Sequence, residues 1–215
     1  MRRILFFIMM ALIAMMVVSC QNSRECRIHG TVVGEQYEGK RIFLVPFTGP
    51  ATAETVDSIE IKDGKFEFTP DSMQMYKILL DYHYRFGIQP LIVIAEPGDI
   101  QVRIDTVSSA VGTPQNDSLQ VWKELTEAHG REYGALNRLI AAKKQHNDTI
   151  EAAKIKEQAR KIHLAYKNRS RAMAANMEGT ILGDFLKGMF PLTYQRKYPD
   201  GRIVTMNADT NEPVE

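Results

Sequence analysis

Hydrophobic and polar residues alternate in short runs through the first half of the chain, and turn residues separate the runs. Ile100, Val102 and Ile104 alternate with polar neighbours, which predicts a strand with one buried face and one solvated face. Several runs of this kind follow one another closely, as they do in β-sandwiches. We therefore expect residues 26–107 to form an antiparallel β-sandwich.

Two tight turns are predicted within this region. Asp63-Gly64 separates two short apolar runs and is typical of a hairpin turn. The sequence Glu-Pro-Gly-Asp at 96–99 is a second turn, because proline fixes one φ angle and glycine permits a positive one. The runs on either side of this second turn are expected to pair as a hairpin over residues 92–104.

The second half of the chain has a helical period. Apolar residues recur at three- and four-residue steps from 119 to 140 and again from 155 to 177, which gives each segment one apolar stripe. We expect residues 108–190 to form an antiparallel helical hairpin that ends in a short third helix. The predicted fold class is therefore α+β. Residues 191–215 are expected to form a turn and a tail that is loose from residue 207.

Polar residues mark the predicted helix starts. Asp148 and Glu151 have the spacing of a capping box at the start of the second long helix. Asn116 or Asp117 is placed to cap the first one by accepting hydrogen bonds from its free N–H groups.

The N-terminus carries a targeting signal. Arg2 and Arg3 precede an apolar run of about fifteen residues, shorter than the roughly 20 that span a bilayer. The run ends in a small residue and Cys20, and this pattern resembles a bacterial lipoprotein signal peptide. The resemblance implies a cleaved signal peptide at residues 1–19, lipid on Cys20 as the contact with the membrane, a tether at residues 20–25 and an outer-membrane location. An uncleaved anchor helix or an ordinary secretory signal is the alternative.

The balance of charges and the number of cysteines argue against nucleic-acid binding and against a disulfide within the mature chain. Removal of Arg2 and Arg3 from the 27 basic residues would leave 25 against 26 acidic ones, a balance that gives no electrostatic case for nucleic-acid binding. With Cys20 lipidated, Cys26 is the one cysteine left and has no disulfide partner within the chain. Its strand position predicts a small buried hydrophobic residue, and a redox thiol is the alternative.

Candidate catalytic and ligand-binding residues are few. Glu96 and Asp99 are suited to acid–base chemistry, but their place in the turn explains them better. The five histidines are scattered without a metal-binding spacing. Trp122 and the tyrosines between 76 and 84 form either a ligand platform or, as aromatic residues more often do, core. We therefore expect no catalytic, cofactor or metal site.

Three motifs together carry a family resemblance. They are DSIEIKDGKFEF at 57–68, IAEPGDIQVRID at 94–105 and GTPQND at 112–117. In this order they resemble the uncharacterised N-terminal domain of lipid-anchored thioredoxin-like (thiol–disulfide interchange) proteins of Gram-negative anaerobes, over roughly residues 26–190. The resemblance implies a small β-domain, a helical segment and an envelope location. In that family a thioredoxin domain with a Cys-x-x-Cys pair follows, and since this chain has no such pair, redox activity is not carried over.

The expected function is non-enzymatic. We expect a lipid-anchored envelope protein that binds another envelope protein or a small ligand through the sandwich or the helical hairpin. The alternative is an accessory or degenerate member of a thiol–disulfide redox system that works with a separate thioredoxin-domain partner.

A repeated tripeptide suggests a modification. Asp, then Ser or Thr, then an aliphatic residue occurs five times, where average composition gives about one match. The pattern resembles the acceptor site of the general O-glycosylation system of the same bacterial group, although helix capping also explains Asp117 and Asp148. We expect sugar first on Thr106 and Ser72, at predicted surface strand–loop junctions. The other hydroxyl residues in the pattern are Ser58, Ser118 and Thr149.

Overall fold

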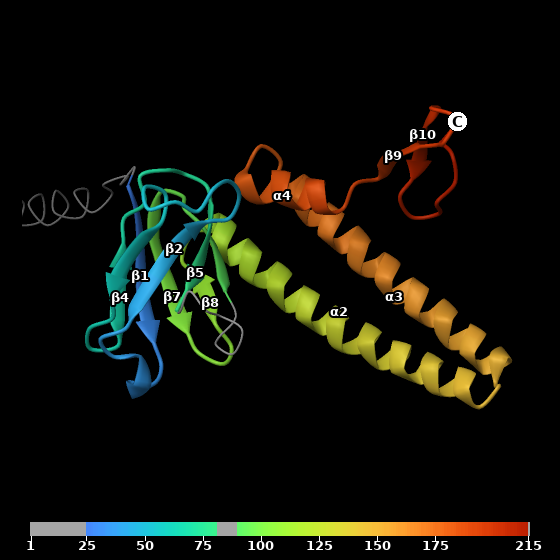
Figure 1. Cartoon of the computed structure of the whole chain (residues 1–215), viewed down its shortest axis with the longest axis horizontal. Coiled ribbons are helices and arrows are strands. Elements are labelled where there is room, and N and C mark those ends of the chain that lie inside the picture. The colour runs from blue at the N-terminus through green and yellow to red at the C-terminus, as the bar shows by residue number, and fades with distance from the viewer. Residues whose placement is uncertain (1–24, 81–89, 215) are drawn as a thin grey trace, which may run out of the picture.

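A computed structural model describes residues 25–80 and 90–214. The fold is α+β, as predicted: two small sheets pack face to face, and a long pair of helices extends from one side of them (Figure 1). The predicted signal peptide, Cys20 and the first part of the tether lie outside the described residues. So do Tyr82, His83 and Tyr84.

The first sheet has the order β4-β1-β7-β8. Its strands are β1 (Cys26–Val32), β4 (Lys65–Phe68), β7 (Gly98–Ile104) and β8 (Ser109–Val111). β1 and β7 run parallel, with Cα partners from Cys26 and Gly98 onward, whereas every pair was expected to be antiparallel. Parallel strands need a long connection between them, and here the whole second sheet supplies it. The β region also continues past the expected boundary at 107, because β8 completes this sheet.

The second sheet has the order β3-β2-β5-β6, and all of its pairs are antiparallel. Its strands are β2 (Arg41–Pro46), β3 (Asp57–Glu60), β5 (Met75–Leu79) and β6 (Leu91–Ile94). The hairpin predicted over 92–104 is wrong, because β6 pairs with β5 in this sheet while β7 belongs to the other one. The predicted tight turn at 96–99 is a bend at Pro97 instead, since Gly98 and Asp99 already belong to β7, and this bend carries the chain from one sheet to the other.

The Asp63-Gly64 turn has the predicted local geometry. Both residues have positive φ, 52° and 65°, as a type I′ turn requires, and Lys62 and Lys65 pair across it. The flanking strands β3 and β4 nevertheless belong to different sheets. This turn, like the bend at Pro97, closes an edge of the sandwich.

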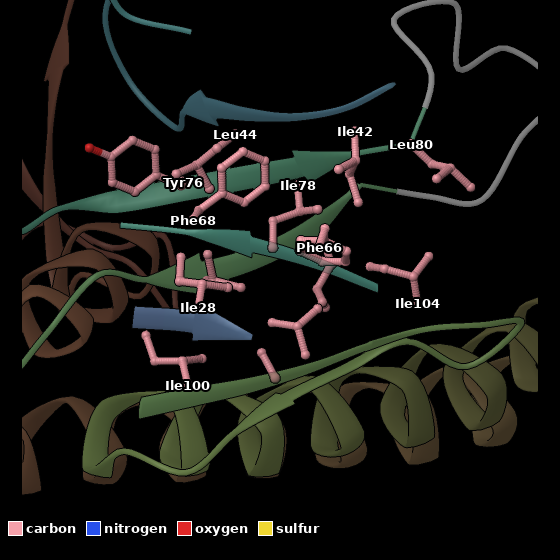
Figure 2. Packing of buried hydrophobic residues seen from close by; sticks show 14 of the residues in the cluster. Ile28, Ile42, Leu44, Phe66, Phe68, Tyr76, Ile78, Leu80, Ile100 and Ile104 are labelled. Carbon is pink, nitrogen blue, oxygen red and sulfur yellow. The ribbon is translucent and has the colours of Figure 1, made fainter. Parts of the chain in front are cut away.

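Aliphatic and aromatic side chains from both sheets fill the space between them (Figure 2). Ile28 and Ile100 point inward from the first sheet, and Ile42 and Ile78 point inward from the second, each at most 2% exposed. Burying one such side chain stabilises the fold by about 1.5–3 kcal/mol. Among the described residues, none from the long helices belongs to this core.

The two long helices are α2 (Pro114–Gln145) and α3 (Thr149–Asn176), and α4 (Ile181–Met189) follows them. A short 3₁₀ turn, η1 (Glu35–Tyr37), lies earlier in the chain. At 1.5 Å per residue α2 is about 48 Å long, so only its first half can contact the sandwich and the rest pairs with α3 alone (Figure 1). The predicted stripes face inward: Leu119, Trp122 and Leu136 are buried on α2.

A second core joins the sandwich to the helices. Ile94 from β6, Leu119 and Trp122 from α2, and Leu182 and Leu186 from α4 pack together in it. α4 thus closes the base of the helical hairpin against the second sheet. Asp148 caps α3 as predicted, since its carboxylate accepts a hydrogen bond from the backbone N–H of Glu151.

The C-terminal part contains a hairpin of β9 (Thr193–Lys197) and β10 (Ile203–Asn207). The predicted turn lies between its strands. The prediction of a loose tail differs from the structure over residues 207–214, because Asp209 forms ion pairs with Lys167 and Arg171 of α3. These cations hold the pKa of Asp209 at about 2, below its usual 3.8, so the hairpin is fastened to the helix by a carboxylate that stays ionised.

Candidate functional site

A buried polar junction connects the sandwich to α2. The Asn116 side chain, which is fully buried, accepts a hydrogen bond from the Ile94 N–H (2.9 Å) and donates one to the Ile94 carbonyl (2.7 Å). It donates a further bond to the Thr113 hydroxyl (2.9 Å). Asn116 thus pairs with β6 much as a neighbouring strand would, and it was expected to be a helix cap instead.

Glu96 is the cap that the sequence left unassigned. Its carboxylate accepts hydrogen bonds from the backbone N–H groups of Gln115 (2.7 Å) and Asn116 (3.3 Å) and from the Gln115 side chain (3.0 Å). These N–H groups belong to the first turn of α2, where the helix dipole favours a negative charge. The helix begins at Pro114 after Thr113, whose side chain makes no capping bond.

The other carboxylates near this junction have separate tasks. Asp99 is exposed and lies 3.1 Å from His29, so the structure does not bring it together with Glu96 as an acid–base pair. Asp117 accepts a hydrogen bond from the Gly112 N–H (2.8 Å) and therefore secures the loop before the helix. A Cβ at Gly112 would lie 2.7 Å from the Asp99 carbonyl, which explains the glycine.

The junction also positions α4. The Gln115 side-chain oxygen accepts a hydrogen bond from the Leu182 N–H (3.0 Å) at the start of that helix. In the described part of the chain, every buried side-chain nitrogen or oxygen has a hydrogen-bond partner. The hydrogen bonds of Glu96, Gln115 and Asn116 thus connect two of the three motifs that carry the resemblance, those at 94–105 and 112–117. We call this network the lock.

A cavity of about 850 Å³ opens beside this lock, between α2 and the end of the sandwich. Its apolar lining includes Leu91, Ala110, Leu119 and Trp122, and hydroxyl groups and charged side chains stand among them. Lys123 crosses from α2 to donate a hydrogen bond to the carbonyl of Ser108, so the helix is tied to the β7–β8 turn beside the cavity.

Trp122, the single tryptophan of the chain, is held rigidly in the cavity wall. Its ring N–H donates to the Ser170 hydroxyl (3.2 Å), and the rings of Phe185 and Phe190 meet it nearly edge-on. Only 8% of the residue is exposed. The two predicted alternatives for Trp122 are thus not exclusive, since the residue is core on one side and cavity wall on the other. Tyr76 lies apart from it, in the sandwich core.

A second, more polar cavity of about 620 Å³ lies beside strands β2, β3 and β5 of the second sheet. It is lined by carboxylate and hydroxyl side chains that include Asp57, Asp71, Ser72 and Tyr76. The Tyr76 hydroxyl is engaged with Gln74 and the Ser72 carbonyl. This cavity brings together two of the five glycosylation tripeptides at one rim.

Two histidines meet between the long helices, and sequence spacing did not reveal them. His129 Nε2 of α2 and His163 Nδ1 of α3 lie 3.3 Å apart and share a hydrogen bond. His129 belongs to the predicted apolar stripe, and the antiparallel register of the helices brings His163 opposite it. Within residues 25–80 and 90–214, no group of three or more His, Cys, Asp or Glu side chains is arranged to hold a metal ion.

Cys26 is buried at the start of β1, as its strand position predicts, with 1% exposed. Burial raises the pKa of its thiol, and a backbone hydrogen bond at Glu96 only partly opposes this shift. A protonated, enclosed thiol is a poor nucleophile, because thiolate is the reactive form.

The five glycosylation candidates differ in accessibility. Thr106, Ser72 and Thr149 are exposed, the first two in loops. Ser58 is half-buried and accepts a hydrogen bond from Arg41, and Ser118 is half-buried against the Met177 sulfur (3.8 Å). Thr106 and Ser72, the two preferred candidates, thus lie on the surface as predicted, and Thr149 is exposed as well. Thr106 lines the rim of the larger cavity.

Comparison with known families adds one match. Residues 26–119 match the model of a family described as a domain of unknown function, DUF4369. The match covers less than half of the chain, and it ends just after the lock between Glu96 and Asn116, where α2 is already secured. No curated protein and no solved structure matches. The described helices include none that is both long enough and apolar enough to cross a bilayer.

Proposed function

We propose that this protein is a lipid-anchored, non-enzymatic binding module of the cell envelope, and that its cavity beside Trp122 binds a small apolar molecule. The observation that carries the proposal is the cavity itself. Its volume of about 850 Å³ falls within the roughly 300–1,000 Å³ typical of small-molecule sites. Its walls come from α2 and from both sheets, and the lock at Asn116 keeps these elements in fixed positions.

The lining indicates what kind of ligand fits. Leu91, Ala110 and the Trp122 ring offer an apolar surface, whereas Thr106 and Thr126 place hydroxyl groups at its margin. A molecule with an aromatic or aliphatic body and a polar end would bury its apolar body against the wall. Its polar end would form hydrogen bonds with the hydroxyl groups at the rim. Such a division of apolar and polar contacts is usual in ligand sites.

The location is proposed from the N-terminal segment. The basic start, the apolar run and Cys20 support lipidation at that cysteine and placement at the outer membrane. Acyl chains stabilise membrane attachment by about 0.8 kcal/mol per buried CH₂ group, so several chains hold the protein firmly. In detergent phase separation, native protein should enter the detergent phase and Cys20→Ala should remain in the aqueous phase. A Cys20→Ala protein that still enters the detergent phase would refute the anchor.

The cavity is tested by fluorescence of the single tryptophan. A chain expressed from residue 21, in a host without the glycosylation system, is titrated with anilinonaphthalene sulfonate, an apolar fluorophore with one polar end. Occupancy beside Trp122 should quench its emission and transfer energy to the fluorophore at a saturating ratio of one per chain. Linear, unsaturable quenching would contradict a defined site.

Two exposed valines provide a matched pair of variants. Val107 lines the cavity rim and is 68% exposed, whereas Val121, on α2 and 56% exposed, does not line it. Val107→Glu should weaken binding roughly tenfold, because it removes an apolar contact and places a carboxylate next to the ligand. Val121→Glu should leave binding unchanged. Equal effects of the two substitutions would place the fluorophore elsewhere.

A further inference from the structure

The paired histidines lie halfway along the helical hairpin, away from the cavity. The ring of His129 stacks on Tyr166 (centroids 4.2 Å apart, 10° between planes) and on Tyr133 (5.2 Å, 21°). The Tyr166 hydroxyl is itself hydrogen-bonded to Thr126 (3.0 Å). The imidazole of His129 is thus held by rings on both helices rather than left to rotate in solvent.

The separation of the two ring nitrogens equals that of two imidazole ligands on one tetrahedral metal ion. Two imidazole nitrogens bound to one tetrahedral zinc ion, each about 2.05 Å from it, lie about 3.3 Å from one another. His129 Nε2 and His163 Nδ1 are 3.3 Å apart without a metal between them. Because this separation already matches that of two ligands of one ion, α2 and α3 need not change their spacing to bind it.

Burial and charged groups of both signs act on the two rings. Burial lowers the pKa of both imidazoles, and the charges of His163 and Lys167 lower the pKa of His129 and of His163, respectively, further. Neutral imidazole is the form that binds metal. The carboxylate of Glu132 raises the pKa of His129. Asp209, which is ion-paired with Lys167 and Arg171, opposes the effect of Lys167 on His163.

We propose that His129 and His163 form a binding site for one divalent transition-metal ion of the type that prefers imidazole, with zinc, nickel and copper as the candidates. The two histidines provide two ligands, and water completes the coordination shell. The ion replaces the proton that the rings now share, and it cross-links α2 to α3 midway along the hairpin. Because it binds the folded hairpin and not the separated helices, it stabilises the fold.

The test uses the full chain, purified in non-ionic detergent, with zinc as the ion. Isothermal titration should show one zinc ion per chain, and zinc should raise the melting temperature by several degrees. His129→Gln and His163→Asn keep a polar amide near the position of each ligating nitrogen, and each should abolish both effects. His146→Ala, at the exposed turn between the helices, and His29→Ala, beside Asp99 and Glu67, should retain them.

Folding and ligation are read out separately. Helix content by circular dichroism should be the same in all four variants without metal, since the pair lies on the margin of the hairpin. In the Cu²⁺-loaded wild type, electron paramagnetic resonance should show hyperfine splitting from two nitrogens. No zinc-dependent rise in melting temperature in the wild type, or an undiminished rise in His129→Gln and His163→Asn, would overturn the proposal.

Discussion

Replacing Asn116 by alanine should weaken the fold more than any exposed substitution on the same helix. The side chain is fully buried and makes four hydrogen bonds, two of them to the backbone of Ile94, one to Thr113 and a longer one (3.5 Å) to Glu96. Alanine leaves the Ile94 N–H and carbonyl without these partners in a site that water does not reach. Each such buried group costs about 1–3 kcal/mol.

The magnitude follows from these groups and from helix propensity. Two unsatisfied backbone groups cost about 3–4 kcal/mol together, and the better helix propensity of alanine returns about 0.5 kcal/mol. We expect a net loss of about 3 kcal/mol in the free energy of unfolding. For a chain of this size that corresponds to a melting temperature lower by roughly 6–12 °C.

Urea unfolding, followed by far-UV circular dichroism, measures this loss directly. The matched control is Asn137→Ala, an exposed asparagine on the same helix, which should change stability by at most about 0.5 kcal/mol. A loss below about 1 kcal/mol for Asn116→Ala would show that the junction does not secure α2 to the sandwich. That result would refute the claim that the Asn116 hydrogen bonds fix the position of α2 in the cavity wall.

Three further outcomes are expected. Because the pKa of Asp209 is lowered to about 2, its ion pairs should stabilise the fold fully above about pH 4 and be lost as pH falls toward 2, and Asp209→Asn should flatten that part of the acid-unfolding profile. Insulin reduction should stay at background with or without Cys26→Ser, since the thiol is buried; turnover that the substitution abolishes would support the redox alternative. Intact mass of envelope-purified protein should exceed the lipidated polypeptide by a glycan increment that Thr106→Ala or Ser72→Ala reduces, and a mass without any increment would refute glycosylation.

The sequence predicted which segments are strands and helices better than it predicted how the strands pair. The alternation of apolar and polar residues shows which face of a strand is buried, but it does not show which strand lies next to it. The parallel pairing of β1 with β7 therefore could not be predicted from the sequence. The change of chain direction at Pro97 was located correctly, but Gly98 and Asp99 belong to β7 and not to a tight turn. Turn chemistry is local, however, and does not decide whether the flanking strands pair with each other.

The junction and the cavity were harder to predict for a related reason. Glu96 and Asn116 both belong to motifs that the sequence analysis identified, but their contact joins segments about twenty residues apart in the chain. Local capping rules offered Asn116 or Asp117 as the cap of its own helix because such rules consider only nearby N–H groups. The cavity is lined by residues of α2, β6 and β8 together, and the period of an apolar stripe carries no information about how these elements are placed relative to one another.

The central claim is that the space beside Trp122 is a ligand site. The most direct measurement is a crystal structure of the chain grown with a brominated naphthalene sulfonate, with data collected at the bromine absorption edge. We predict one strong anomalous peak inside the cavity, in contact with Trp122 and Ala110. Peaks only on outer surfaces, or an empty cavity beside an occupied helical hairpin, would contradict the account.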